Sequence, residues 1–246
     1  MNPVLGPDGH SVVVAIDHPL YSWPCTGLED RATKLRTVAA AGADAVIASY
    51  GTIRDCRQWF GNAEPILKLD LSTVTLGGSY PVSEFLPAWD LEDAQRLGVR
   101  AVLTYVQLGA PFELEALRTA GRIAAACDKA GLTYVCEIMP VESQRFPEPA
   151  AADAIAAACR TAAELGAHVV KTTMPEPAEG IVDAVACGVP VLVAGGAMAA
   201  DRGAMLGAVR QVMRAGAAGV AFGRNVWGTA DPAGMVAALR DIVHGE

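Results

Sequence analysis

Short runs of β-branched and other apolar residues alternate along this chain with Ala-rich stretches whose apolar positions follow helical spacing. The short runs predict eight β-strands, at residues 11–17, 44–49, 65–71, 100–105, 133–138, 168–172, 190–194 and 219–222. The longer stretches predict helices at residues 28–41, 91–97, 113–130, 150–165, 181–187, 201–215 and 232–243, and residues 51–62 have room for a short helix. Strands and helices are therefore expected to alternate over nearly the whole chain.

Glycine marks the end of most predicted helices. Six of them are followed by Gly and then a small or branched residue, as at Gly42 and Gly166, and glycine supplies the left-handed residue that leads into a strand. Eight βα units build a parallel sheet, and no nucleotide-binding glycine fingerprint follows the first strand, which favours a closed barrel over a doubly wound sheet. Such a barrel needs about 250 residues. The 246 residues therefore predict one α/β domain over residues 1–246, a (β/α)₈ TIM barrel, although the length alone would permit two small domains.

Composition narrows the classes of function. Hydrophobic residues make up 52% of the chain, which suits buried parallel strands covered by closely packed helices. The formal net charge is −8 and no long basic run exists, so nucleic acid and membrane surfaces are poor partners. No apolar stretch reaches the roughly 18–20 residues of a membrane span, and the first residues do not resemble a signal peptide. Six scattered cysteines without a CxxC pair predict free thiols in a cytoplasmic protein.

The barrel indicates where to look for chemistry, because active sites of this fold lie at the C-terminal ends of the strands. Lys171 ends the sixth predicted strand, in the sequence His-Val-Val-Lys-Thr-Thr. Burial in a packed barrel disfavours the charged ammonium group, and a neutral lysine is a nucleophile toward carbonyl carbons. Lys171 is therefore the candidate for Schiff-base catalysis. The alternative is a strand-end lysine that reaches solvent or pairs with a carboxylate.

Four ionisable residues fall at the ends of the first and third predicted strands. Asp17 would lie at the barrel mouth, where it could hold a substrate hydroxyl or move a proton, unless it pairs with a lysine. The neighbouring His18 is a candidate for substrate binding, although a lone histidine in a loop is often structural. Lys68 and Asp70 alternate with apolar residues and therefore share one face of their strand, where Lys68 is a candidate for catalysis and Asp70 a candidate for substrate binding. If that face is inward, the charge of Lys68 favours the neutral form of Lys171; the alternative is that Lys68 and Asp70 simply pair.

Glu137 is the candidate proton carrier. It lies near the end of the fifth predicted strand, in the sequence Val-Cys-Glu-Ile-Met. A carboxyl group acts as a general acid or base when its surroundings match its proton affinity to the task. A salt bridge from Glu137 to Lys171 or Lys68 is the alternative, and it does not exclude a role in proton transfer.

Glycines follow the last two predicted strands. Gly195 and Gly196 come after the seventh strand, and Gly223 and Arg224 come after the eighth. Glycine lets backbone N–H groups approach an anion closely, and a short helix beginning there adds positive potential. Arg224 can add a bidentate cation. Because the loops after strands seven and eight are the usual phosphate site of this fold, these four residues predict a site for a phosphorylated small molecule.

Together these motifs resemble class I aldolases of the deoxyribose-phosphate and tagatose-bisphosphate aldolase superfamily, and among them the archaeal-type fructose-bisphosphate aldolases. The resemblance runs over nearly the whole chain, from Asp17 and His18 through Val-Lys-Thr at 170–172 to Gly-Arg-Asn at 223–225. It implies a lyase of carbohydrate metabolism in which Lys171 forms a Schiff base and a phosphorylated ketose is cleaved or formed. No metal and no cofactor are expected, because the lysine supplies the electron sink. The resemblance also implies a homo-oligomer.

The chain departs from the pattern of this group at several positions. The archaeal-type enzymes place Tyr-Pro after the fifth strand, with the tyrosine as proton shuttle, whereas this chain has Met139-Pro140. The tagatose-bisphosphate branch uses a glutamate on that strand, and Glu137 is similar. Ala194 stands where a serine is common, and Asp70 stands where an asparagine is common. We expect these departures to leave the fold and the Schiff-base chemistry unchanged and to affect the identity of the substrate more.

Two other functions stay open. A transaldolase-like synthase or a thiolase-like acyl transferase would use the same barrel and lysine, and a requirement for coenzyme A would distinguish the thiolase. An inert phosphosugar-binding barrel would bind its ligand without turnover, although it has little need of lysine, glutamate and aspartate at strand ends. The aromatic residues Trp23, Trp59, Phe60 and Trp89 are expected in a subunit interface, in a substrate lid or in local packing.

Overall fold

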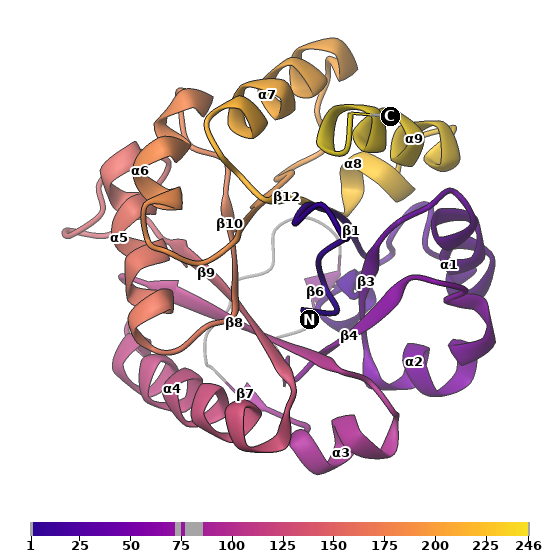
Figure 1. The fold of residues 1–246 in the computed structure, drawn as a ribbon, viewed down its shortest axis with the longest axis horizontal. Coiled ribbons are helices and arrows are strands. Elements are labelled where there is room, and N and C mark those ends of the chain that lie inside the picture. The colour runs from indigo at the N-terminus through magenta and orange to yellow at the C-terminus, as the bar shows by residue number, and fades with distance from the viewer. Residues whose placement is uncertain (1, 72–74, 77–85, 246) are drawn as a thin grey trace.

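The computed structural model describes residues 2–71, 75–76 and 86–245. Eight parallel strands close into a barrel, and helices surround it (Figure 1). The barrel strands are β1 (Ser11–Ala15), β3 (Ala45–Ala48), β4 (Glu64–Lys68), β8 (Ala101–Leu108), β9 (Thr133–Pro140), β10 (Val169–Thr173), β11 (Val191–Ala194) and β12 (Gly219–Phe222). The expected (β/α)₈ TIM barrel is confirmed.

The helices follow the predicted alternation. They are α1 (Arg31–Ala40), α2 (Tyr50–Cys56), α3 (Leu91–Arg96), α4 (Glu113–Ala130), α5 (Ala152–Glu164), α6 (Ile181–Val185), α7 (Arg202–Arg214), α8 (Arg224–Trp227) and α9 (Pro232–Val243). Three 3₁₀ turns add η1 (His18–Leu20), η2 (Arg57–Trp59) and η3 (Ala178–Gly180). Helix α1 begins later than predicted because the Asp30 side chain caps it by accepting the N–H of Thr33 (3.0 Å). Among the helices described, none combines the length and apolar character that a membrane crossing requires.

Both faces of the barrel strands are buried, and they belong to two separate parts of the core. Along β1, Val12 and Val14 join the cluster that packs against the helices. Val13 and Ala15, which alternate with them, join the cluster inside the barrel. Strands covered on both faces read as continuous apolar runs, which is why the eight runs were visible in the sequence.

The third barrel strand is shorter than predicted. β4 ends at Lys68, and the next residues form β5 (Asp70–Leu71), which pairs antiparallel with β7 (Leu86–Pro87). The backbone N–H of Tyr105 on β8 donates to the Asp70 carboxylate (3.0 Å) rather than to a backbone carbonyl, so the ladder between β4 and β8 ends there. A second small pair joins β2 (Ser22–Trp23) to β6 (Thr75–Leu76). β8 and β9 extend beyond the predicted ends because they stay paired as far as Leu108 and Pro140.

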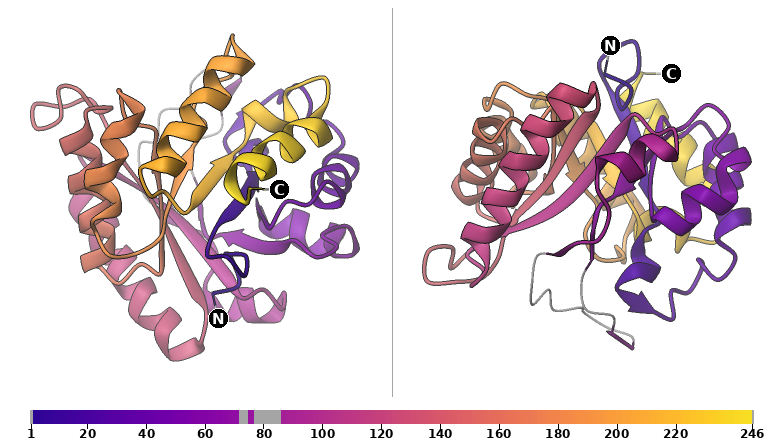
Figure 2. Two further views of the ribbon diagram at one scale, coloured as in Figure 1. Left: turned by 45° about the horizontal axis from the view of Figure 1, so that its top comes forward. Right: turned by 90° about the horizontal axis from the view of Figure 1, so that it is seen from below.

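The N-terminal end of the barrel is closed by the first residues of the chain. Val4 is fully buried with the inner cluster, and its carbonyl accepts the Ser11 hydroxyl (2.7 Å). The two termini lie at the same end of the barrel (Figure 2). His244 joins them, since its Nδ1 lies 2.7 Å from Asp8 Oδ2 and its Nε2 lies 3.0 Å from Asp44 Oδ2.

The four aromatic residues named above do not gather into one surface. Trp59 and Phe60 precede β4 and therefore lie toward the N-terminal end of the barrel, where Phe60 is buried. Trp23 follows β1 at the opposite end and is 46% exposed. Trp89 stacks on Tyr50 with ring centroids 5.9 Å apart. The four residues therefore do not share one surface, and the stacking of Trp89 on Tyr50 agrees with the alternative of local packing.

Candidate active site

Strand alternation determines which polar side chains enter the barrel. On β4, β9 and β10, an apolar residue of the inner cluster is followed two positions later, on the same face, by an ionisable residue. The pairs are Ile66 and Lys68, Val135 and Glu137, and Val169 and Lys171. The same spacing puts Tyr105 above Leu103 on β8. These side chains form a polar layer directly above the apolar interior, at the C-terminal end of the barrel.

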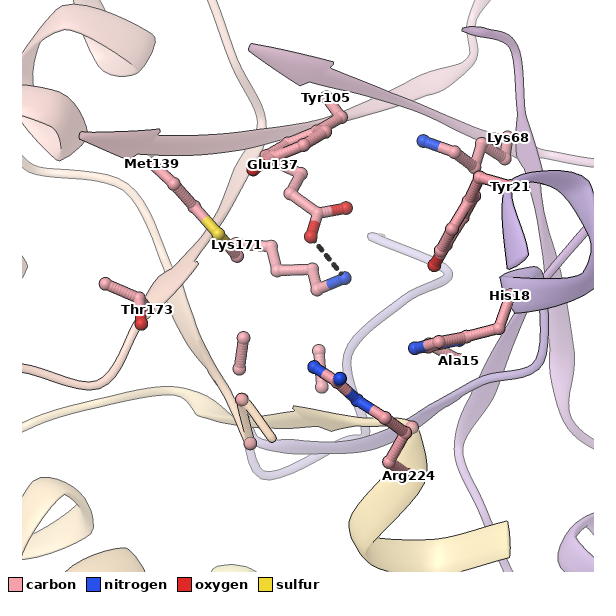
Figure 3. A pocket seen from close by; sticks show the side chains of 15 residues that line it. Ala15, His18, Tyr21, Lys68, Tyr105, Glu137, Met139, Lys171, Thr173 and Arg224 are labelled. Atoms are coloured by element: carbon pink, nitrogen blue, oxygen red, sulfur yellow. Dashed lines mark ion pairs between the residues drawn. The ribbon is translucent and has the colours of Figure 1, made fainter. Parts of the chain in front are cut away.

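A pocket opens above this layer (Figure 3). Eight of the ten predicted site residues line it, namely His18, Lys68, Glu137, Lys171, Gly195, Gly196, Gly223 and Arg224. Asp17 and Asp70 do not line it and lie buried behind His18 and Lys68. The structure thus brings together groups that are far apart in the sequence.

Lys171 and Glu137 form an ion pair in the pocket. They face each other across adjacent strands, because Lys171 on β10 is in register with Glu137 on β9. Lys171 Nζ lies 2.7 Å from Glu137 Oε1, and their side chains are 8% and 11% exposed. Figure 3 shows the two side chains pointing toward one another from neighbouring strands. The arrangement sets a proton acceptor beside a primary amine that solvent barely reaches.

Lys68 is held by a second carboxylate. Its Nζ lies 3.0 Å from Asp70 Oδ2, and both side chains are nearly fully buried. Burial opposes the charge of Lys68, but the carboxylates of Asp70, Asp17 and Glu137 outweigh it and raise the pKa of Lys68. Lys68 Nζ also lies 5.7 Å from the centre of the Tyr105 ring. Lys68 therefore stays a cation and faces the same pocket as Lys171.

His18 is neutral in this pocket. Burial is the main cause that lowers its pKa to about 4, and the charges of Lys171, Arg224 and Lys68 add to that effect although Asp17 opposes it. The imidazole packs edge-on against Trp227, with ring centroids 5.1 Å apart. Its Nδ1 and Asp17 Oδ1 are buried and lack a hydrogen-bond partner among the described residues. The other oxygen of Asp17 accepts the Tyr21 hydroxyl at 3.5 Å.

Two of the three glycines after β11 and β12 are required by close packing, whereas Gly196 has open space beside it and a φ of +66°. A Cβ on Gly195 would lie 2.9 Å from the Phe222 ring, and a Cβ on Gly223 would lie 2.6 Å from His18 Cε1. Asn225 holds the two loops together, because its Nδ2 donates to the carbonyl of Gly195 (2.7 Å) and to a second carbonyl two residues further on. Its Oδ1 accepts a backbone N–H from the same loop.

Sequence reasoning missed three residues of this end of the barrel. Tyr105 was placed on a strand but not on the inward face, although its spacing from Leu103 carries that signal. Tyr21 lines the pocket from an irregular segment after β1, where no periodicity could reveal it. Asn225 belongs to the Gly-Arg-Asn motif, but its bracing role depends on the β11 loop, which only the fold brings near.

Among the described residues, no group of three or more His, Cys, Asp and Glu side chains is arranged to hold a metal ion. Metal independence stays a prediction. The chemistry that the pocket does offer is a desolvated amine beside a carboxylate, with glycine turns and one arginine at the ends of the next two strands. A barrel with these groups above its apolar core has the architecture of a Schiff-base lyase.

Comparison with known proteins identifies the family. The model of the DeoC/LacD family aldolases matches residues 11–229, and the chain belongs to this family. It is 34% identical to the 2-amino-3,7-dideoxy-D-threo-hept-6-ulosonate synthase of Halobacterium salinarum, over 97% of this chain and 88% of that protein. It is 32% identical to the class 1 fructose-bisphosphate aldolase of Thermoproteus tenax, over 96% of this chain and 90% of that protein.

A solved structure agrees with this assignment. The chain matches a Schiff-base-forming fructose-1,6-bisphosphate aldolase with a TM-score of 0.86 and 31% identity, over 98% of this chain and 96% of that one. The expected family and the expected enzyme class, an aldolase of the lyase type, are therefore confirmed. The relatives include both aldolases and aldolase-like synthases.

Proposed function

We propose that this protein is a class I aldolase in which Lys171 forms a Schiff base with the carbonyl carbon of a phosphorylated ketose or keto-compound. The observation that carries the proposal is the buried ion pair between Lys171 and Glu137, with 2.7 Å between Nζ and Oε1. A lysine must lose a proton before it can attack a carbonyl carbon, and Glu137 is within reach of that proton. Burial above an apolar layer keeps water from competing for the carbonyl.

The reaction follows from these two groups. Glu137 accepts a proton from the Lys171 ammonium, and the neutral amine adds to the carbonyl carbon. Glu137 then returns a proton to the resulting hydroxyl, which leaves as water as the C=N⁺ bond forms. In the cleavage direction a base removes the proton of the hydroxyl on the carbon that becomes the aldehyde, and the electrons of the broken C–C bond move to the iminium nitrogen.

The phosphate group binds beside Lys171, at the ends of the neighbouring strands β11 and β12. Gly195, Gly196 and Gly223 expose backbone at the ends of β11 and β12, and Arg224 adds a guanidinium that can bind two phosphate oxygens. Gly196 supports this role, because the open space beside it leaves its backbone accessible to a ligand. Binding the phosphate orients the carbonyl toward Lys171.

The remaining residues support this machinery. His18 is a neutral hydrogen-bonding group for the substrate, and Asp17 takes part in proton transfer through the Tyr21 hydroxyl. Lys68 adds a second cation to the pocket that Lys171 lines. Asp70 was expected to bind substrate, but its position behind Lys68 supports a positioning role instead.

The proposal extends to the setting of the enzyme. We infer one catalytic domain over residues 1–246, acting in the cytoplasm on sugar phosphates as a homo-oligomer, without metal or cofactor. The length of the family match and the similarity to metabolic enzymes support this setting.

A synthase is the second candidate function. The identity to a synthase over 97% of this chain favours it, as does Met139, which lines the pocket where a tyrosine proton shuttle is expected. A synthase would form the C–C bond from the same iminium. An acyl transfer of the thiolase type would be recognised by a requirement for coenzyme A.

Reductive trapping tests the proposed function. Borohydride with dihydroxyacetone phosphate should leave a covalent adduct on the wild-type chain, because borohydride reduces the C=N⁺ bond. Lys171→Met should leave no adduct. The matched control is Lys68→Arg, which keeps the second cation but removes the other primary amine of the pocket, and it should still be trapped. An adduct on Lys171→Met, or none on the wild type with any phosphorylated ketone, would overturn the proposal.

A further inference from the structure

The cations of the pocket are already largely matched by carboxylates. All 19 Lys and Arg residues of the chain lie in the described ranges. Three of them line the pocket, namely Lys68, Lys171 and Arg224. Three buried carboxylates lie in or behind it, on Asp17, Asp70 and Glu137. The site is therefore close to neutral before any substrate binds.

Two of the three cations are committed to ion pairs. Lys68 is paired with Asp70 at 3.0 Å, and Lys171 is paired with Glu137 at 2.7 Å. Within the described ranges Arg224 pairs with no carboxylate, and it reaches into the pocket from the start of α8 (Figure 3). Arg224 is thus the cation of the pocket that is available to an anionic ligand.

The wall opposite Arg224 offers no unpaired cation among the described residues. In the closed order of the barrel, β12 lies four strands from β8, which is the opposite side. Tyr105 on β8 and Met139 on β9 line the pocket there. The charged groups beside them are already paired, since Glu137 on β9 pairs with Lys171 and Lys68 on the neighbouring β4 pairs with a buried carboxylate. On the side of Arg224 itself, His18 is neutral, since burial and nearby cations lower its pKa to about 4. An anion on the wall opposite Arg224 would lose its water without gaining an unpaired cation.

Other basic side chains near the barrel mouth are also occupied. Arg31 at the start of α1 pairs with Asp55 at 2.7 Å, and Arg145 after β9 pairs with Glu113. Arg202 at the start of α7 donates to a backbone carbonyl of α9. None of these three arginines lines the pocket. The charge of the pocket is therefore set by its three cations and the three buried carboxylates.

We propose that the substrate carries a single phosphate, bound at Arg224, and that its other end carries no second anionic group. This inference rests on the proposed function and deepens it, because it separates monophosphate from bisphosphate substrates within one chemistry. The relative from Thermoproteus tenax is named for a bisphosphate. The charge balance of this pocket favours a different substrate class, a ketose monophosphate that joins a phosphorylated ketone to an uncharged aldehyde.

Two ketoses that differ only in the second phosphate test the inference. Fructose 1-phosphate and fructose 1,6-bisphosphate are compared by kcat/KM for cleavage and by the rate of borohydride trapping. A second phosphate that is desolvated without a partner should lower kcat/KM by about tenfold or more. A tenfold preference for the monophosphate supports the inference, and any smaller ratio, or a preference for the bisphosphate, overturns it. Trapping of both ketoses at Lys171 with the wrong preference leaves the proposed function standing, whereas no trapping of these ketoses or of any other phosphorylated ketone overturns both.

A charge variant provides the matched control. Met139→Lys adds a cation on the wall opposite Arg224, and Met139→Gln adds a neutral polar group of similar length. Met139→Lys should shift the preference toward the bisphosphate by about tenfold relative to Met139→Gln. Equal preferences in the two variants would show that charge on this wall does not select the substrate, and would overturn the inference.

Discussion

Replacing Lys68 by methionine should lower the free energy of unfolding, because the buried carboxylate of Asp70 loses its ion-pair partner. In Lys68→Met the side chain keeps its length but loses its charge, while Asp70 stays buried with one backbone N–H donor, that of Tyr105. Breaking a buried ion pair by removing one partner costs about 3–5 kcal/mol. Protonation limits this cost, because neutralising an aspartate at pH 7 requires about 4 kcal/mol. We therefore expect a loss of about 3–4 kcal/mol in the free energy of unfolding.

The loss in the free energy of unfolding should become smaller as the pH falls. Burial raises the pKa of Asp70, and Lys68 is the main group that opposes the rise. Without Lys68 the pKa of folded Asp70 rises further, so the folded state binds more protons than the unfolded state. The deficit of Lys68→Met should then shrink by about 1.4 kcal/mol per pH unit as the pH falls from 7 toward 5.

Thermal unfolding at several pH values measures this effect. At pH 7 the midpoint of Lys68→Met should fall by roughly 6–16 °C, since about 2–4 °C corresponds to 1 kcal/mol at this chain length. The matched control is Lys68→Met/Asp70→Asn, which removes the buried charge and keeps an acceptor for Tyr105. It should lie within about 1–2 kcal/mol of the wild type at every pH. The reasoning would be refuted if the single variant lost the same stability at every pH, or if the double variant were no more stable than the single one.

Three further changes test other parts of the account. Gly223→Ala should cost about 1–3 kcal/mol by thermal unfolding and lower kcat/KM, because its Cβ would lie 2.6 Å from His18 Cε1; an unchanged kcat/KM would contradict the close packing. Asn225→Ala should raise KM for phosphorylated ketones, because it releases the Gly195 loop, while trapping of unphosphorylated dihydroxyacetone at Lys171 stays within about twofold; an equal loss with both ketones would contradict a role at the phosphate. Burial lowers the pKa of His244, but its hydrogen bonds to two aspartates raise it overall, so its stabilisation is complete below about pH 6.5 and is lost as pH rises through the folded pKa. His244→Gln should thus cost about 1 kcal/mol at pH 6 and less at pH 9 in thermal unfolding, and a larger cost at pH 9 would contradict that sign.

Much of the fold and part of the site could be predicted from the sequence. The apolar runs were visible because both faces of each strand are buried, and Lys171 ended the sixth run. What could not be predicted is which carboxylate meets which lysine. Glu137 could have paired with Lys171 or Lys68, and only the register between β9 and β10 selects Lys171.

The rest of the site depends on where strands end and loops turn. Asp70 continued the alternation of its run, so it was expected to bind substrate beside Lys68. Instead the carboxylate of Asp70 accepts the N–H of Tyr105 and ends the strand pair, which a single strand's pattern cannot reveal. Tyr21 lies in an irregular segment, where no periodicity exists to place it.

The central claim is that Lys171, and not the other buried lysine, forms the Schiff base. The most direct test is peptide mapping by mass spectrometry after borohydride trapping with a phosphorylated ketone. Lys68 and Lys171 lie on β4 and β10, and they fall in different proteolytic peptides. The account predicts the added mass on the peptide that contains Lys171, with the Lys68 peptide unmodified. An adduct on the Lys68 peptide, or on neither, would contradict it.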